Sequence, residues 1–175
     1  IADADGDGSN EILARSLIDH SIRIYWLRDD HPQTFGEVAS LVDFSLGDGE
    51  MSSRFVVADL DQDYRQEILV GDADGDIWSY EFDSGAFVPS FQLDGSDETD
   101  ARIVGGGQDL DGDGNVEFAV ARAFPNESDA FNGWWDLEIY EMTGNREATL
   151  EWVQRISGVA SPGNGISTGD LDGDG

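Results

Sequence analysis

Short apolar runs alternate with turn-forming stretches along the chain. Three of them directly follow an acidic stretch: ILA at 12–14, ILV at 68–70 and FAV at 118–120. A turn then leads to a longer run: IRIYWL at 22–27, IWSYEF at 77–82 and LEIYEM at 137–142. In the first of these, Ile22, Ile24 and Trp26 fall on one face. This period of two predicts half-buried β-strands.

Two more runs complete each unit. A third run, such as FVPSFQL at 87–93, follows the second. A fourth precedes each later acidic stretch: RFVVADL at 54–60, RIVGGGQDL at 102–110 and GISTGDL at 165–171. The segment at 35–46 also fits an amphipathic helix, but its Val, Phe and Leu content and its place in the repeat favour a strand. The pattern therefore predicts about four short antiparallel strands per unit.

The acidic stretch recurs at Asp3, Asp59, Asp109 and Asp170, a period of roughly 50–60 residues. It divides the chain into approximate units 3–58, 59–108 and 109–169, with 170–175 starting a fourth. Four short strands in a unit of this size are typical of a β-propeller blade. We therefore expect an all-β fold of about three four-stranded antiparallel blades that belong to a larger propeller, because a closed propeller needs at least about four blades.

Both ends of the sequence lie inside a motif, which suggests a piece of a longer protein. The strand expected before Asp3 falls outside the sequence, and residues 165–171 resemble the strand that opens a blade. Three blades cannot curve far enough for residues 165–171 to pair with residues 11–27. We therefore expect further blades, or another copy of the chain, at the open edges.

The acidic loop places aspartates at positions one, three and five, an arrangement that is repulsive unless a cation lies among them. Glycines at positions four and six allow the chain to curl, so that the three side chains turn inward. Such an oxygen cage suits Ca²⁺ better than Mg²⁺, which requires stricter octahedral geometry. The loop is not an EF-hand, because its last acid stands at position nine and strand residues follow directly. The alternative is a solvated acidic turn, which four copies in phase with the strands disfavour.

The pattern D-x-D-x-D-G-x-x-E, followed by a short apolar strand and repeated along the chain, resembles the FG-GAP and VCBS repeats. These repeats build the calcium-bearing blades of integrin-α-like β-propellers. The resemblance implies carboxylate ligands at positions one, three, five and nine and a backbone carbonyl ligand at position seven. The implied ligands are Asp3, Asp5, Asp7, Ser9 and Glu11; Asp59, Asp61, Asp63, Arg65 and Glu67; Asp109, Asp111, Asp113, Asn115 and Glu117; and, in the incomplete fourth loop, Asp170, Asp172 and Asp174.

Two stretches depart from this pattern. In the second loop Tyr64 stands at position six, where a positive φ is expected, so this site should be strained and bind calcium more weakly. The stretch GDADGD at 71–76 has no following acid, and its Asp74-Gly75 pair is typical of a β-hairpin. We interpret it as a turn.

Charge and composition exclude several partners. The chain has 38 acidic and 9 basic residues and a formal net charge of −29, which argues against nucleic acid and against an anionic membrane surface. No apolar run is long enough for a membrane-spanning helix, so we expect no membrane insertion. There is no cysteine, and His20 and His31 lack the spacing of metal ligands.

The function that these features favour is calcium-dependent adhesion or recognition of a protein or glycan, at the cell surface or outside the cell. A second interpretation is part of a carbohydrate-active enzyme, such as a calcium-dependent polysaccharide lyase, although no catalytic motif is visible. A third is a structural scaffold of a large secreted protein. Aromatic residues at 122–136, Phe124, Phe131, Trp134 and Trp135, suit stacking on a partner, but we favour packing of the two tryptophans between blades.

Overall fold

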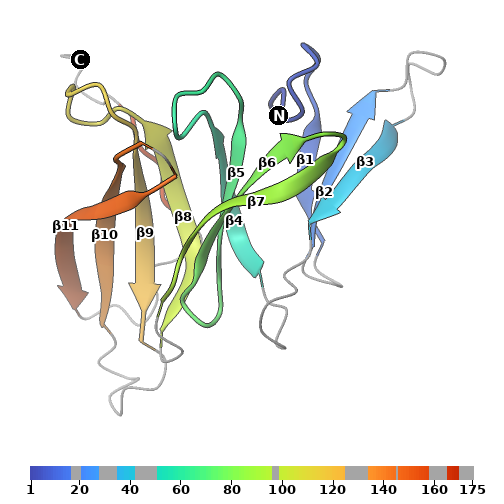
Figure 1. The fold of residues 1–175 in the computed structure, drawn as a ribbon. Helices are drawn as coiled ribbons and strands as arrows, with labels where there is room; N and C mark the ends of the chain where they lie inside the picture. Colours follow the sequence, from blue (N-terminus) through green and yellow to red (C-terminus); the bar gives the residue numbers. More distant parts are fainter. Residues whose placement is uncertain are drawn as a thin grey trace.

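The computed structural model describes residues 1–16, 21–27, 35–41, 51–95, 99–124, 134–144, 146–157 and 165–169. In these ranges the chain forms three antiparallel sheets, side by side, and no helix (Figure 1). The part that is described accordingly has no helix long and apolar enough to cross a membrane. The predicted all-β fold of propeller blades is therefore confirmed.

Each sheet is a meander in which consecutive strands pair. The first has the order β1-β2-β3, the second β4-β5-β6-β7 and the third β8-β9-β10-β11, counted from the inside outward. The bounds are β1 Ile12–Arg15, β2 Ile22–Leu27, β3 Phe35–Leu41, β4 Met51–Ala58, β5 Glu67–Asp72, β6 Ile77–Asp83, β7 Ala86–Leu93, β8 Asp100–Gln108, β9 Glu117–Ala123, β10 Trp134–Met142 and β11 Ala148–Ser157. The segment predicted as a strand at 35–46 is one over residues 35–41, and its remainder lies outside the described residues.

The three acidic loops in the described residues occupy equivalent places. In each unit the residue before the first aspartate pairs with the glutamate at position nine, as Ala2 with Glu11, Ala58 with Glu67, and Gln108 with Glu117. This pairing closes each loop at its base, between the innermost strand position and the next strand. All three loops lie on the same side of the molecule (Figure 1).

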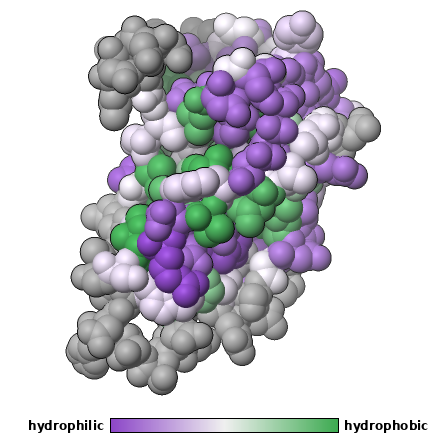
Figure 2. Space-filling view, turned by 90° about the vertical axis from the view of Figure 1, so that its left-hand side faces the viewer, coloured by the Kyte–Doolittle hydropathy of each residue, from purple (hydrophilic) through white to green (hydrophobic). Residues whose placement is uncertain are grey.

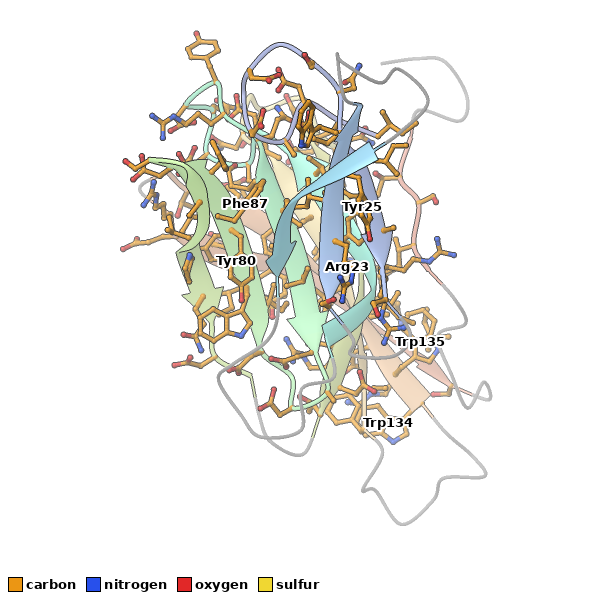
Figure 3. All side chains as sticks on the ribbon, turned by 90° about the vertical axis from the view of Figure 1, so that its right-hand side faces the viewer. Arg23, Tyr25, Tyr80, Phe87, Trp134 and Trp135 are labelled. Carbon is orange, nitrogen blue, oxygen red and sulfur yellow. The ribbon has the colours of Figure 1, made fainter. Side chains whose placement is uncertain are left out.

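Apolar side chains fill the space between neighbouring sheets. The second blade packs on the first through Ile22 and Ile24 against Ile68 and Val70, with Tyr80 and Phe87 beside them (Figure 3). A larger cluster lies between the second and third blades and consists of Val56, Ala58, Leu60, Leu69, Ile77 and Phe91 together with Ala101, Val104, Val116, Phe118, Val120 and Met142. Strand β5 is buried on both faces because it lies at the centre of these two layers.

Residues 165–169 differ from the expected strand. They carry no strand hydrogen bonding in the described part of the chain, although they lie against β8. Gln108 Nε2 donates to Thr168 Oγ1 at 2.9 Å, and Ile166 lies close to Gly105. The apolar pattern alone could not reveal this, because a strand also needs a hydrogen-bonding neighbour.

The tryptophans of the third blade also differ from expectation. Trp134 packs within its own sheet, at a ring-centroid distance of 4.0 Å from Phe124 and with the guanidinium of Arg155 3.4 Å above its ring. Figure 3 shows Trp134 and Trp135 at the end of the molecule away from the acidic loops. The prediction that Trp134 packs between blades is therefore wrong. The residues against its ring, Phe124 and Arg155, both belong to the third blade.

The outer strand of the third blade presents apolar side chains to solvent. Leu150, Trp152 and Val153 of β11 are each about half exposed, and Figure 2 shows apolar residues gathered in the middle of this face. The stability of the fold therefore rests on the two inner layers rather than on this strand.

Phe118 offers a test of that layered core. Its side chain is fully buried, stacks on Tyr140 at 5.3 Å and lies 6.2 Å from Phe91 of the second blade. We expect Phe118→Ala to lower the free energy of unfolding by about 3–5 kcal/mol, because it removes a large side chain between two blades. Leu150→Ala, at an exposed position, should cost less than about 1 kcal/mol. Urea denaturation at one fixed calcium concentration measures both; equal effects would contradict the proposed core.

Candidate metal-binding loops

The three loops in the described residues repeat one set of hydrogen bonds. The aspartate at position one accepts the N–H of position six: Asp3 from Gly8, Asp59 from Tyr64 and Asp109 from Gly114, each at 3.0 Å. The aspartate at position five accepts the N–H of position seven: Asp7 from Ser9, Asp63 from Arg65 and Asp113 from Asn115. These local bonds curl the chain inward, as the sequence pattern predicts.

The glutamate at position nine lies beneath each loop and is almost completely buried. Glu11, Glu67 and Glu117 are 1%, 2% and 3% exposed. In each case Oε2 accepts the backbone N–H of position two, which is Ala4, Leu60 or Leu110, at 2.6–2.8 Å. This bond fixes one carboxylate oxygen, while the other oxygen of Glu67 and of Glu117 is buried without a hydrogen-bond partner.

Carboxylate oxygens from positions one, three and nine gather at one point in each loop. The sets are Asp3, Asp5 and Glu11; Asp59, Asp61 and Glu67; and Asp109, Asp111 and Glu117. Within each set the oxygens lie within 4.8 Å of one another, which is about twice a calcium–oxygen distance. The structure thus brings together three of the four carboxylates predicted for each loop.

Position five lies apart from these sets. Asp7 and Asp63 join none of the acidic clusters in the described residues, and Asp113 joins a different one, with Glu117 and Glu141. At position seven, Ser9, Arg65 and Asn115 occupy equivalent places in the curl. The fourth set, Asp170, Asp172 and Asp174, lies outside the described residues, as do His20 and His31.

Several oxygens of these carboxylates are buried and make no hydrogen bond. They are Asp3 Oδ1, Asp59 Oδ1, Asp61 Oδ1, Glu67 Oε1 and Glu117 Oε1. A buried polar atom without a partner costs about 1–3 kcal/mol, and more when it is charged. All five belong to the clusters at positions one, three and nine, so one kind of partner would satisfy them all: a cation bound by oxygen atoms.

The electrostatics of the loops agree with this geometry. Burial, with a further contribution from the charges of Asp61, Asp59 and Asp63, raises the pKa of Glu67 to about 8, although the hydrogen bond from the backbone N–H of Leu60 opposes the shift. Burial also raises the pKa values of Glu11, Glu117 and Asp61, again with a contribution from neighbouring acids. A cation in the cluster would act in the opposite direction, because it favours the charged form of each carboxyl.

The second loop carries strain that the other two avoid. Tyr64 has a φ of 73°, and the glycines at the same position of the other two loops, Gly8 and Gly114, have 90° and 99°. The positive φ expected at Tyr64 is therefore confirmed. Gln62 at position four also has a positive φ, 61°, a departure that the sequence analysis missed. A glutamine there was visible in the sequence, since the first and third loops have glycine. Gln62 gains a contact in exchange, because its Nε2 donates to the carbonyl of Gly114 in the third loop at 2.7 Å.

Two arginines lie beside the second loop. Arg65 and Arg146 both bind the carboxylate of Glu81, which is 2% exposed, and Arg146 belongs to the β10–β11 turn of the next blade. The Nε of Arg146 also lies 3.8 Å from Oδ2 of Asp61. This positive charge close to a candidate ligand is a second reason, besides strain, for weaker cation binding at the second loop.

The stretch at 71–76 contains the turn of the β5–β6 hairpin, as predicted; its first two residues end β5. Oδ1 of Asp72 accepts the N–H of Asp76, and Asp76 accepts the N–H of Gly95 and the side-chain amide of Gln92. The carboxylates of Asp72, Asp74 and Asp76 lie near one another, but the bonds of Asp76 serve to fix the hairpin against the segment after β7.

A cavity of about 330 Å³ lies between the first and second loops. Asp5 and Gly6 line it from one side, and Tyr64, Arg65 and the turn at 82–84 line it from the other. Tyr64 lies at the edge of the cavity and is 97% exposed. The cavity combines a carboxylate, a guanidinium and an aromatic ring.

The family described as FG-GAP-like repeat matches residues 3–70 and 109–175, more than half of the chain. The chain belongs to the FG-GAP-like repeat family. The matched segments contain all four acidic loops, together with the strands that follow the first three. No curated protein matches the chain.

Exchange of the residue at position six tests the strain in the second loop. We expect Tyr64→Gly to raise the free energy of unfolding by about 1 kcal/mol without calcium, because it removes a left-handed non-glycine residue. Gly114→Tyr in the third loop is the matched control and should lower it by a similar amount. In a calcium titration of the unaltered chain, the second loop should bind calcium less tightly than the third. Tyr64→Gly should reduce this difference in calcium affinity. If neither substitution changes the denaturation curve, the strain assigned to Tyr64 is absent.

Proposed function

We propose that the chain is a calcium-binding propeller module of an extracellular or cell-surface protein, which recognises a protein or a glycan. The observation that carries the calcium part is the set of five buried carboxylate oxygens without hydrogen-bond partners, distributed over three equivalent loops. Membership of the FG-GAP-like repeat family supports the same assignment, since such repeats often bind calcium and are typical of extracellular proteins.

The chemistry of the donors favours calcium among common cations. Each described loop offers only oxygen atoms, and the chain has no cysteine thiolate that would favour zinc. Calcium accepts six to eight oxygen ligands in flexible geometry, which suits a loop that combines carboxylates with a backbone carbonyl and water. In the first loop, Asp3, Asp5, Asp7 and Glu11 would hold the ion together with the carbonyl of Ser9. The ion would neutralise the charge of these carboxylates. It would also connect the base of the loop to its tip, because its ligands come from both.

Calcium binding should therefore stabilise the folded chain. At a calcium concentration about 100 times the dissociation constant, each occupied site adds about 2.7 kcal/mol to the free energy of unfolding. We expect the thermal midpoint to rise markedly on addition of calcium and to fall again with EGTA. Magnesium at the same concentration should have a much smaller effect. Differential scanning calorimetry and isothermal titration calorimetry measure these quantities.

Two matched variants locate the effect. Glu117→Gln removes a carboxylate from the third loop, whereas Glu147→Gln removes one from the exposed β10–β11 turn. We expect the first variant to lose one binding event and the second to retain all of them. Absence of calcium heat in the unaltered chain, with no change in its thermal midpoint at millimolar calcium, would falsify the assignment.

The cavity between the first and second loops supports the recognition part of the proposal. Calcium in the first loop would fix Asp5 and Gly6 on one wall, so the shape of the cavity would depend on the ion. Tyr64 offers an exposed aromatic ring for a sugar face or for an apolar side chain of a partner.

Arrays of glycans and of purified cell-surface proteins test this recognition. We expect binding in calcium that is lost in EGTA, and a decrease of about tenfold in affinity for Tyr64→Ala, as for an aromatic residue at the centre of an interface. Trp152→Ala is the control, because this half-exposed tryptophan lies on β11, the outer strand of the third blade. Calcium-bound protein that binds neither kind of array would favour a structural scaffold instead.

A further inference from the structure

Glu141 stands opposite Glu117 in the third blade. The register of β9 and β10 pairs these two glutamates directly, next to the third loop. Like charges at directly opposed positions of an antiparallel pair are destabilising. Glu117 is 3% exposed, and its Oε1 is buried without a hydrogen-bond partner. Glu141 is partly exposed and its carboxylate is hydrogen-bonded with the side chain of Asn115, a neutral partner. Positive charge that faces both carboxylates would remove the remaining repulsion.

The second blade shows how the protein meets the same need with its own side chains. There the opposed glutamates are Glu67 and Glu81, and two arginines, Arg65 and Arg146, bind Glu81. In the first blade the problem does not arise, because continuation of the β1–β2 register places Trp26 opposite Glu11.

The third blade has the opposed acids without the arginines. No arginine forms an ion pair with Glu117 or Glu141 in the described ranges of the chain. Instead, carboxylate oxygens of Asp113, Glu117 and Glu141 lie within 4.8 Å of one another. An ion about 2.4 Å from each oxygen, the distance usual for calcium, could contact all three.

We propose that Glu141 is an additional ligand of the cation held by the third loop. It acts with Asp113 and Glu117, and it gives this site a carboxylate from the neighbouring strand that the first and second loops lack. The inference rests on the calcium-binding function proposed above. Calcium affinity rises with the number of charged ligands, so the third loop is the tightest of the three described sites.

Substitution of Glu141 tests the assignment in the full chain. Amide signals of Gly112 and Gly114 in ¹⁵N-¹H NMR spectra report the third loop during a calcium titration, and those of Gly6 and Gly8 report the first. We expect Glu141→Gln to weaken calcium binding at the third loop about tenfold, because one charged ligand is lost. The first loop should be unchanged. Without calcium the same variant should unfold at a higher temperature than the unaltered chain, since it removes a repulsive pair.

Two further variants separate a ligand from a distant charge. Glu151→Gln removes an exposed acid of β11 that contributes to the same local field, and it should leave the affinity of the third loop within about twofold. Glu141→Asp keeps the charge but shortens the side chain by one methylene, and it should weaken binding if Glu141 contacts the ion. Equal affinities for Glu141→Asp and the unaltered chain, or for Glu141→Gln and Glu151→Gln, would overturn the assignment.

The outcome also distinguishes this inference from the proposed function. If the unaltered chain binds no calcium at any loop, the proposed function fails, and the ligand assignment fails with it. If all loops of the unaltered chain bind calcium and Glu141→Gln binds equally well at the third, only the assignment of Glu141 is wrong.

Discussion

The repulsion among the carboxylates gathered in each loop is the constraint on which the rest of the structure depends. Each described loop draws three carboxylates to within 4.8 Å and buries the glutamate at its base. Burial, together with the charges of Asp61, Asp59 and Asp63, raises the pKa of Glu67 to about 8, so the arrangement is costly in the absence of positive charge. The backbone hydrogen bonds inside the loop hold the carboxylates in place, but they occupy only some of their oxygens. A bound cation would turn this cost into a contribution to stability.

The blades place these loops in a common layer. The glutamate at position nine follows the loop and pairs with the residue before it, so the base of the loop is part of the sheet. Because the sheets pack through continuous apolar layers, the loops face the same side and approach one another. Gln62 and Arg146 then connect the second loop to the third blade. A cation bound at one loop would therefore act on a neighbouring loop as well as on its own strand pair.

The three loops share a motif but differ in their surroundings. The second loop has two non-glycine residues at positive φ and an arginine from the next blade near Asp61. The third has glycines at both positions and a further acid, Glu141, close to its cluster. The loops differ further in the residue opposite position nine, which is Trp26, Glu81 or Glu141. If the loops bind calcium as proposed, one framework would thus supply sites of different strength.

The sequence by itself determined the all-β fold, the repeat and the content of each loop. Those features are local: the curl joins residues at most seven apart, and alternate apolar residues reveal a strand without knowledge of its neighbours. The aligned runs IRIYWL, IWSYEF and LEIYEM even contain the signal for Glu81 and Glu141, each of which follows the shared tyrosine.

Only the tertiary structure decided which residues these two glutamates meet. The register of the strands sets Glu141 against Glu117, and blade packing carries Arg146 to Glu81, 65 residues away in the chain. It also left residues 165–169 without strand pairing and set Trp134 against Arg155 rather than between blades. Such contacts join residues that are distant in sequence, and their partners are chosen by sheet register and packing rather than by any pattern within one run.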